Sequence, residues 1–354
     1  MEDTPLKVER GWHGRAALSN PSNRFDSLKL VWEEEYTVGR KVQKTLFYED
    51  PTSEILSYNQ SPDLGFEISL NPYRGCEHGC IYCYARPTHE YLGFSLGVDF
   101  ESRILVKTKA PQLLEKTLRS PKWRPKVVMV SGVTDCYQPC EAHFKLTRSC
   151  LEIFLKYHNP VTLISKSRLL CRDLDILKAL AKEKLLSVFL SITTLDPKLA
   201  AILEPRASSP ALRLETISSL AEAGIPVGVM VAPIIPGLND FEMPMILKSA
   251  SEAGASYAGY SILRLPWGVR DLFLEWLAYH YPEKKEKVLC RIKDFREGKL
   301  TDSHFGRRFS GSGKIAAEFS QWFGCFLRKY KLTEKHKAIQ RQQPDAEMDL
   351  FESL

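Results

Sequence analysis

The sequence predicts an α/β fold, a partial (β/α)6 TIM-like barrel with an N-terminal extension and a basic helical C-terminal region. Short, nearly continuous apolar runs alternate with helical patterns along the middle of the chain, which is typical of parallel strands buried on both faces. The chain has 354 residues, of which 44% are hydrophobic, so it can bury a large core. Six βα units leave too little chain for two more, so we expect an open barrel; a doubly wound sheet is the alternative.

The apolar runs predict six strands, at residues 66–70, 126–131, 161–166, 187–192, 227–232 and 256–262. The patterns between them predict helices, among them residues 146–157, 173–183, 211–223 and 242–253. Ser209 and Pro210 supply an N-cap and a proline at the first helical position. Gly224 and Gly254 follow two of these helices, as C-terminal glycines do.

The chain divides into four expected segments. These are an N-terminal extension that wraps the core, the barrel, a basic helical region and a polar tail, at residues 1–64, 65–268, 269–332 and 333–354. In the basic region we expect helices and one loop or hairpin, at residues 271–281, 283–297 and 314–331 and at residues 303–313.

Composition predicts a cytosolic protein without a membrane span. Residues 1–15 lack the apolar run of a signal peptide, and prolines break the longest apolar stretch. Nine cysteines in such a chain indicate thiols and metal ligands rather than disulfides. Four of them lie in helical apolar patterns and are expected to pack as small hydrophobes, namely Cys150, Cys171, Cys290 and Cys325.

The most informative stretch is a loop with three cysteines, Cys76, Cys80 and Cys83, directly after the first predicted strand. Thiolates on one short loop can hold an iron–sulfur cluster. A 4Fe–4S cluster has four irons, so three cysteines leave one iron for a ligand that is not protein. Zinc is less favoured, because it usually takes four ligands and would require His78 or His89.

In barrels of parallel strands, active sites collect at the C-terminal ends of the strands. The second predicted strand leads into a loop that contains Cys136 and Cys140. The third, fourth and fifth strands end near Lys166, Ser191 and Ala232. We therefore expect thiols, an amine, a hydroxyl and a small apolar surface on one rim.

The spacing of Cys76, Cys80 and Cys83, followed by Tyr84, resembles the radical S-adenosylmethionine (radical SAM) superfamily. The neighbourhood is similar to the spore photoproduct lyase-like subfamily, including its relatives of unassigned function. The similarity extends over most of the chain, and its supporting motifs lie at residues 71–76, 83–89, 134–139, 203–207 and 232–234.

This resemblance implies a 4Fe–4S cluster and S-adenosyl-L-methionine as cofactors. In the family, the reduced cluster cleaves SAM to methionine and a 5′-deoxyadenosyl radical, which abstracts hydrogen from substrate. The resemblance also implies an electron donor such as a flavodoxin or ferredoxin. A monomer is expected.

The resemblance assigns roles residue by residue. Cys76, Cys80 and Cys83 would be the cluster ligands, Tyr84 would line the SAM pocket, and Tyr82 is a candidate radical relay. Three strand-end residues would contact the SAM carboxylate, ribose and adenine, in the order Lys166, Ser191 and Ala232. A purely structural role at the strand end is the alternative for each of these three.

This sequence departs from the spore photoproduct lyase pattern at the cysteine that, in the lyase, returns a hydrogen atom to the product radical. Cys136 and Cys140 occupy the corresponding loop, but in a different local pattern. Either thiol could donate the hydrogen, and either could simply pack. Thymine-dimer reversal is therefore not assigned from the sequence.

Charge suggests a class of substrate. Residues 284–331 hold thirteen Lys or Arg against five Asp or Glu, which suits a polyanion such as DNA, although a solvated helical surface explains it equally well. Candidate contacts to phosphates and bases are Arg307, Arg308, Lys314, Trp322 and Phe323. The alternatives are a radical SAM enzyme for a peptide or small molecule, and a non-catalytic iron–sulfur electron-transfer or sensor protein.

Overall fold

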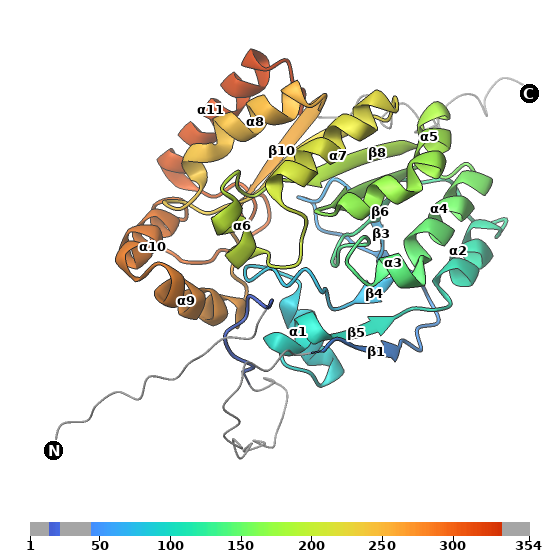
Figure 1. Cartoon of the computed structure of the whole chain (residues 1–354), viewed down its shortest axis with the longest axis horizontal. Coiled ribbons are helices and arrows are strands. Elements are labelled where there is room, and N and C mark those ends of the chain that lie inside the picture. Colours follow the sequence, from blue (N-terminus) through green and yellow to red (C-terminus); the bar gives the residue numbers. More distant parts are fainter. Residues whose placement is uncertain (1–13, 22–43, 335–354) are drawn as a thin grey trace, which may run out of the picture.

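The structure, a computed structural model, describes residues 14–21 and 44–334 (Figure 1). The expectations for residues 1–13 and 22–43 of the N-terminal extension, and for the tail beyond residue 334, lie outside the described residues. A seven-stranded sheet in the order β10-β9-β8-β7-β6-β3-β2 forms the centre. Its strands are β2 (Leu56–Tyr58), β3 (Ile68–Leu70), β6 (Val128–Val130), β7 (Val161–Ser165), β8 (Leu186–Ser191), β9 (Val227–Ile234) and β10 (Tyr257–Ile262).

All six predicted strands are present, from β3 to β10, and every neighbouring pair among them is parallel. Only β2 runs antiparallel, against β3. The order of strands leaves β10 and β2 at opposite edges, so the described sheet is open. The prediction of an α/β fold with an open, partial barrel is confirmed.

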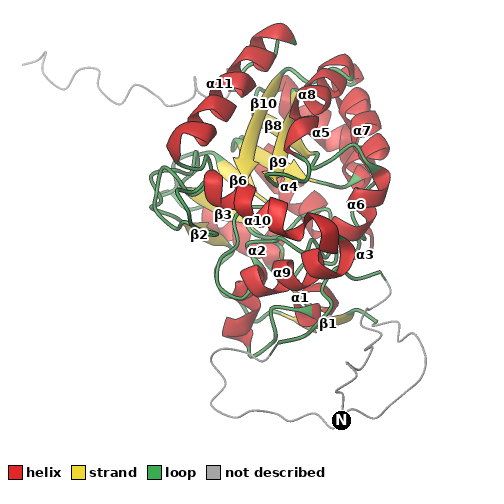
Figure 2. Cartoon of the chain, turned by 90° about the vertical axis from the view of Figure 1, so that its left-hand side faces the viewer, coloured by secondary structure: helices red, strands yellow, loops and turns green. Residues whose placement is uncertain are grey.

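Helices cover the outer face of the sheet, as the apolar strands require (Figures 1 and 2). They are α2 (Ala110–Leu118), α4 (Leu146–Lys156), α5 (Leu174–Lys182), α7 (Pro210–Glu222) and α8 (Met243–Glu252). The side chain of Ser209 accepts the N–H of Leu212 and caps α7, with Pro210 at its first position. Gly224 and Gly254 have positive φ after α7 and α8, so these sequence signals were correctly interpreted.

A second, three-stranded sheet in the order β1-β5-β4 was not predicted. Its strands are β1 (Leu46–Glu49), β4 (Tyr73–Arg74) and β5 (Arg103–Val106). β4 precedes the cysteine loop directly, so this sheet supports the loop from one side. Short helices connect these parts, namely η1 (Arg86–Leu92), α1 (Val98–Ser102), α3 (Glu141–Phe144), η2 (Arg168–Asp173), α6 (Pro197–Leu203) and η3 (Asp240–Glu242).

The C-terminal region is helical, as predicted, and packs against strand β10 at the edge of the sheet. It contains α9 (Val269–His280), η4 (Pro282–Lys284), α10 (Lys285–Asp294) and α11 (Gly313–Lys329). From α11, the rings of Phe319 and Phe323 pack on Tyr260 of β10, at centroid distances of 5.6 and 4.6 Å. No helix in the described part of the chain is long and apolar enough to cross a membrane. The division into four segments stays a prediction.

Candidate active site at the C-terminal ends of the strands

The three cysteines lie together on the loop after β4. Cys76 and Cys80 are buried and Cys83 is half-buried, and none forms a disulfide. Burial raises the pKa of the Cys76 thiol, and the neighbouring Cys80 and Cys83 thiols raise it further. Burial likewise raises the pKa of Cys80 to about 12, and Cys83 is among its neighbours. The loop therefore brings three thiols into one shielded space.

This donor set fits an iron–sulfur cluster better than a zinc ion. Among the described residues, no three His, Cys, Asp or Glu side chains converge on one metal position. Cysteines of a cluster bind separate irons, so they need not converge on one point. The histidines that zinc would require have other partners: His89 Nε2 bonds the carbonyl of Arg103 at 2.8 Å, and His78 Nδ1 lies 3.3 Å from Asp135.

A buried arginine braces the cysteine loop from behind. Arg86 is fully buried and donates to four backbone carbonyls, of which those of Gly79 and Cys80 belong to the loop, at 3.0 and 2.9 Å. Its guanidinium also pairs with the buried carboxylate of Glu101. Glu101 in turn accepts the N–H groups of Ala16 and Ala17, so one ion pair joins the N-terminal extension to the loop. In the sequence, Arg86 was noted only as part of the motif at residues 83–89, and no role was assigned to it.

A second buried network joins the ends of β7 and β8. The carboxylate of Glu204 pairs with Arg213, accepts Thr193 Oγ1 at 2.6 Å, accepts the Tyr82 hydroxyl, and lies 4.0 Å from Lys166 Nζ. Burial alone would raise the pKa of Glu204, but the Arg213 and Lys166 charges lower it to about 2. Glu204 is therefore ionised and orients both a phenol and an ammonium group. In the sequence, Glu204 stood out only as part of the motif at residues 203–207, without an assigned role, and Arg213 was not identified.

Most of the predicted SAM-site residues lie around this network. Lys166 Nζ is 5.8 Å from the ring centroid of Tyr82, and the thiol of Cys80 raises the pKa of Lys166 against the effect of burial. Ser191 is buried, and its carbonyl accepts Arg213 Nη1 at 3.0 Å. The carbonyl of Ala232 accepts Thr193 Oγ1, also at 3.0 Å. The structure thus places Tyr82 and Lys166 beside Cys80 and joins Ser191 and Ala232 to the same network through their backbone carbonyls. The roles of all four residues stay predictions.

Tyr84 stands apart from this network. It is 48% exposed, and its hydroxyl donates to the carbonyl of Gly132 at 2.6 Å. Gly132 follows β6, so Tyr84 spans from the cysteine loop to the next strand end.

The two candidate hydrogen-donor thiols have different surroundings. Cys136 is fully buried in the main core, and its N–H donates to Ser131 Oγ at 2.7 Å. Cys140 is 4% exposed and packs in a separate cluster with Tyr73. Burial raises the pKa of Cys140, as do the nearby Glu77 and Cys76. Cys140 therefore lies near Cys76 and Glu77 of the cysteine loop, and the donor role stays a prediction for both thiols.

Several of the side chains predicted to contact nucleic acid are already paired or buried within the protein. Arg307 pairs with Glu297 and Asp302, at 3.4 and 3.5 Å, and Arg308 is held by a carboxylate of the β2–β3 loop. Phe323 is only 2% exposed, so the expectation that it stacks on a base is wrong: α11 turns this ring into the core. Lys314 and Trp322 remain exposed, at 89% and 60%.

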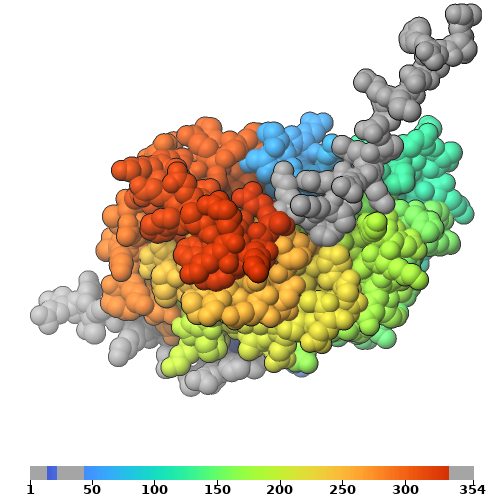
Figure 3. Space-filling view, turned by 90° about the horizontal axis from the view of Figure 1, so that it is seen from above, coloured from blue at the N-terminus to red at the C-terminus, as the bar shows by residue number. Residues whose placement is uncertain are grey.

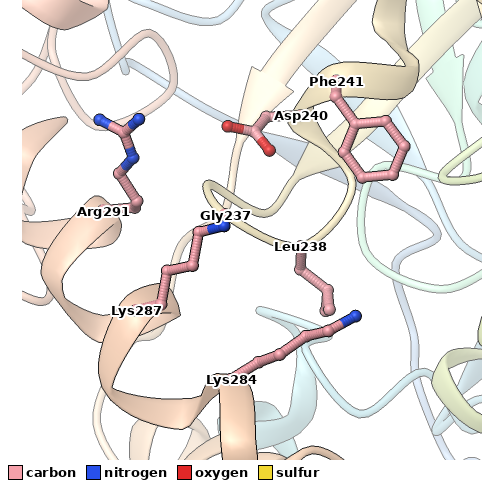
Figure 4. A pocket seen from close by; sticks show the side chains of 7 residues that line it. All are labelled: Gly237, Leu238, Asp240, Phe241, Lys284, Lys287 and Arg291. Carbon is pink, nitrogen blue, oxygen red and sulfur yellow. The ribbon is translucent and has the colours of Figure 1, made fainter.

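A basic hollow lies beside the barrel mouth, between the loop after β9 and α10 (Figure 4). Its cavity volume is about 300 Å³, and it is lined by Gly237, Leu238, Asp240, Phe241, Lys284, Lys287 and Arg291. None of the site residues predicted from the sequence lines it. It is a separate surface feature of the same rim.

Comparison with known proteins identifies the class. Residues 70–250 match the family model of the radical SAM superfamily. This segment is more than half of the chain, so the chain belongs to the radical SAM superfamily. Members of this superfamily are enzymes, and the family implies a 4Fe–4S cluster and SAM.

The curated relatives are uncharacterized proteins. Those of Mycobacterium tuberculosis and Mycobacterium bovis are 36% identical over 222 residues, which is 62% of this chain and 65% of theirs. The match thus spans less than two thirds of the length of these relatives. A protein of Methanocaldococcus jannaschii is 29% identical over 224 residues, covering 63% of this chain and 80% of its own.

Among solved structures, the fold matches spore photoproduct lyase. A cysteine-to-serine mutant of that lyase aligns with a TM-score of 0.58 and 15% identity over 82% of this chain and 81% of its own. A second mutant structure of the lyase, with bound AdoMet and dinucleoside spore photoproduct, aligns equally well. At this identity the likeness shows a shared fold.

Proposed function

We propose that this chain binds a 4Fe–4S cluster through Cys76, Cys80 and Cys83, cleaves SAM reductively, and abstracts hydrogen from a nucleic-acid substrate. The observation that carries the proposal is the position of the buried thiol loop beside the Glu204 network, at the C-terminal ends of the strands. When bound, the cluster supplies the electron that cleaves SAM to methionine and a 5′-deoxyadenosyl radical.

The residues around the loop supply binding and shielding. The Lys166 ammonium would bind the SAM carboxylate, a charge-assisted contact that Glu204 orients from the opposite side. The Ser191 hydroxyl would bind the ribose of SAM, and Ala232 would pack against the adenine face. Tyr84 would line the exposed side of the pocket. Burial of this rim excludes water and other groups that a primary radical would attack.

Two observations support nucleic acid as the substrate class. The lyase that shares this fold has been solved with dinucleoside spore photoproduct. The C-terminal region between residues 284 and 331 carries the excess of Lys and Arg. Repair of a pyrimidine lesion would require the damaged base to leave its stack and enter the barrel mouth. Cys140 or Cys136 would then return a hydrogen atom, and a flavodoxin- or ferredoxin-type donor would supply electrons.

The test is anaerobic reconstitution with iron and sulfide, reduction, and incubation with SAM. We expect the wild-type protein to release 5′-deoxyadenosine, detected by chromatography, and Cys83→Ala to release none. Cys290→Ala is the matched control and should behave as wild type. The expectation that Cys290 and Cys325 pack as small hydrophobes is wrong, because both are exposed, Cys290 on α10 and Cys325 on α11. An intact cluster without 5′-deoxyadenosine release would reject the enzyme and favour an electron-transfer or sensor protein.

The proposed role of Cys140 or Cys136 as hydrogen donor is tested separately, by the product that each variant forms. If Cys140 or Cys136 returns hydrogen, its replacement by alanine should leave SAM cleavage intact and change the product formed from a lesion-containing oligonucleotide. Identical products from both variants would remove the assignment.

A further inference from the structure

The open side of the barrel is spanned by one ion pair. The carbonyl of Phe309 accepts the N–H of Ile262 at 2.7 Å, so the segment before α11 runs along the end of β10. From this segment, Arg308 Nη2 and Nε reach the two oxygens of Asp63 at 2.6 and 2.7 Å. Asp63 lies between β2 and β3, at the other edge of the sheet. Figure 3 shows this early segment (blue) beside the C-terminal region (orange).

Next to this bridge lies an arginine with unused donors. Arg264 follows the end of β10, is half-buried, and has its guanidinium carbon 5.5 Å from the ring centroid of Phe309. Arg308 lies 4.8 Å from the same ring. Within the described ranges, the Arg264 side chain makes no hydrogen bond and no ion pair. Burial lowers the pKa of Arg264, and the like charge of Arg308 lowers it further.

A third arginine adds to the excess of positive charge. Arg296 is 1% exposed, and its Nη2 donates to the carbonyls of Leu263 and Arg308 at 2.6 and 3.1 Å. Its Nε and Nη1 are buried without a hydrogen-bond partner in the part of the chain that the structure describes. Asp302 is the nearby carboxylate, but it already accepts the ring of His304 at 2.6 Å. The buried charge of Arg296 therefore adds to the positive potential around Arg264, which favours an anionic ligand there.

The group formed by Arg264, Arg296 and Arg308 lies on the rim that carries the proposed active site. Arg264 follows the C-terminal end of β10, and the proposed active site collects at the same ends of the neighbouring parallel strands. An exposed aromatic ring lies beside Arg308: Phe305 is 58% exposed, and the guanidinium carbon of Arg308 lies 4.8 Å from its centroid. A guanidinium beside an exposed ring suits a nucleotide, because the cation binds the phosphate and the ring stacks on the base.

We propose that Arg264 and the exposed ring of Phe305 form a phosphodiester-binding subsite at the open side of the barrel, and that Arg308, which is already paired with Asp63, positions the Phe305 ring. Its ligand is the backbone phosphate of a nucleotide next to the reacting base. The inference rests on the proposed function, since it supplies the place where a nucleic-acid substrate is held.

The test measures binding, which requires no turnover. A fluorescein-labelled single-stranded thymidine octamer is titrated with reconstituted protein and SAM at several salt concentrations, and anisotropy is followed. We expect Arg264→Gln to weaken binding about tenfold. The slope of log affinity against log salt should become shallower by about 0.7, the value for one phosphate contact on a single strand. Arg270→Gln is the control, because Arg270 is exposed on α9 and pairs only with its neighbour Asp271 among the described residues.

Two further variants separate a binding role from a structural one. Arg264→Lys should keep most of the salt slope, because a lysine also neutralises one phosphate. Phe305→Ala, at a position that is 58% exposed, should weaken binding and leave the slope unchanged. Iron content and circular dichroism verify that each variant is folded and loaded.

The proposal fails if Arg264→Gln binds the octamer with unchanged affinity and slope, or if Arg270→Gln loses as much. An acidic peptide of matched charge is the second probe. If it binds more tightly than the octamer and depends on Arg264, the subsite takes carboxylates and the phosphodiester assignment is wrong. Failure of SAM cleavage in the wild type would instead reject the proposed function, and is read by a separate assay.

Discussion

Replacement of Arg86 by methionine tests whether the buried guanidinium holds the cysteine loop in place. Methionine keeps the apolar stem but leaves the carbonyls of Gly79 and Cys80 without this donor and Glu101 without its Arg86 partner, with the charge of Arg15 still nearby. Removal of one partner from a buried ion pair costs about 3–5 kcal/mol, because the other charge stays buried. Glu101 keeps the N–H groups of the 14–21 segment, so we expect the lower part of that range.

The free energy of unfolding of the apo-protein is measured by urea titration, and bound iron is measured per chain after reconstitution. Both should fall in Arg86→Met. Arg168→Met is the control, because Arg168 and its partner Glu215 are each more than half exposed, and an exposed pair contributes at most about 1 kcal/mol. The double variant Arg86→Met/Glu101→Gln should recover part of the loss, since it removes the buried carboxylate charge that Arg86 had paired with. Equal stability and iron content in Arg86→Met and Arg168→Met would refute the reasoning.

Three further predictions concern the same region. Gly79→Ala should lose iron, because a Cβ there would lie 2.7 Å from a buried carboxylate oxygen, whereas Gly93→Ala, with a similar φ but open space, should keep iron at a cost of about 1 kcal/mol. Lys166→Met should weaken SAM binding about tenfold in equilibrium dialysis, and no weakening relative to the exposed control Lys178→Met would contradict the assigned contact. Burial lowers the pKa of His89 to about 4 from 6.5, so the unfolded chain binds a proton first as pH falls. Stability should therefore be full above pH 6.5 and decline toward pH 4, by about 3 kcal/mol, and His89→Phe should flatten this profile in urea titrations.

The barrel was predictable because its strands and helices carry strong local patterns. The apolar runs at β7, β8 and β9 reflect burial on both faces, and this burial is a property of each segment by itself. The small sheet was missed for the opposite reason. β1 is exposed at all four positions and β4 has only two residues, so neither carries an apolar period that a sequence could reveal.

The candidate site was predicted only where its residues form a motif. Cys76, Cys80 and Cys83 stand out because one short loop must supply several thiolates, and this spacing is visible in the chain. Phe323 was misjudged because an aromatic ring in a basic helix can face either solvent or core. The packing of α11 against β10 decides this, and no local pattern reports it.

The sequence by itself determined the class of the protein: six βα units, a loop with three thiols, and the superfamily that this loop indicates. Only the tertiary structure decided which buried charges meet. Arg86 with Glu101, Glu204 with Arg213 and Lys166, and Arg308 with Asp63 all join separate elements. The physical reason is that periodicity and spacing report whether a side chain is buried, whereas the partner of a buried charge is set by the folded chain. The spacing of the three cysteines is visible in the sequence. The arginine that supports their loop, Arg86, and the Arg308–Asp63 pair across the open side of the barrel are visible only in the structure.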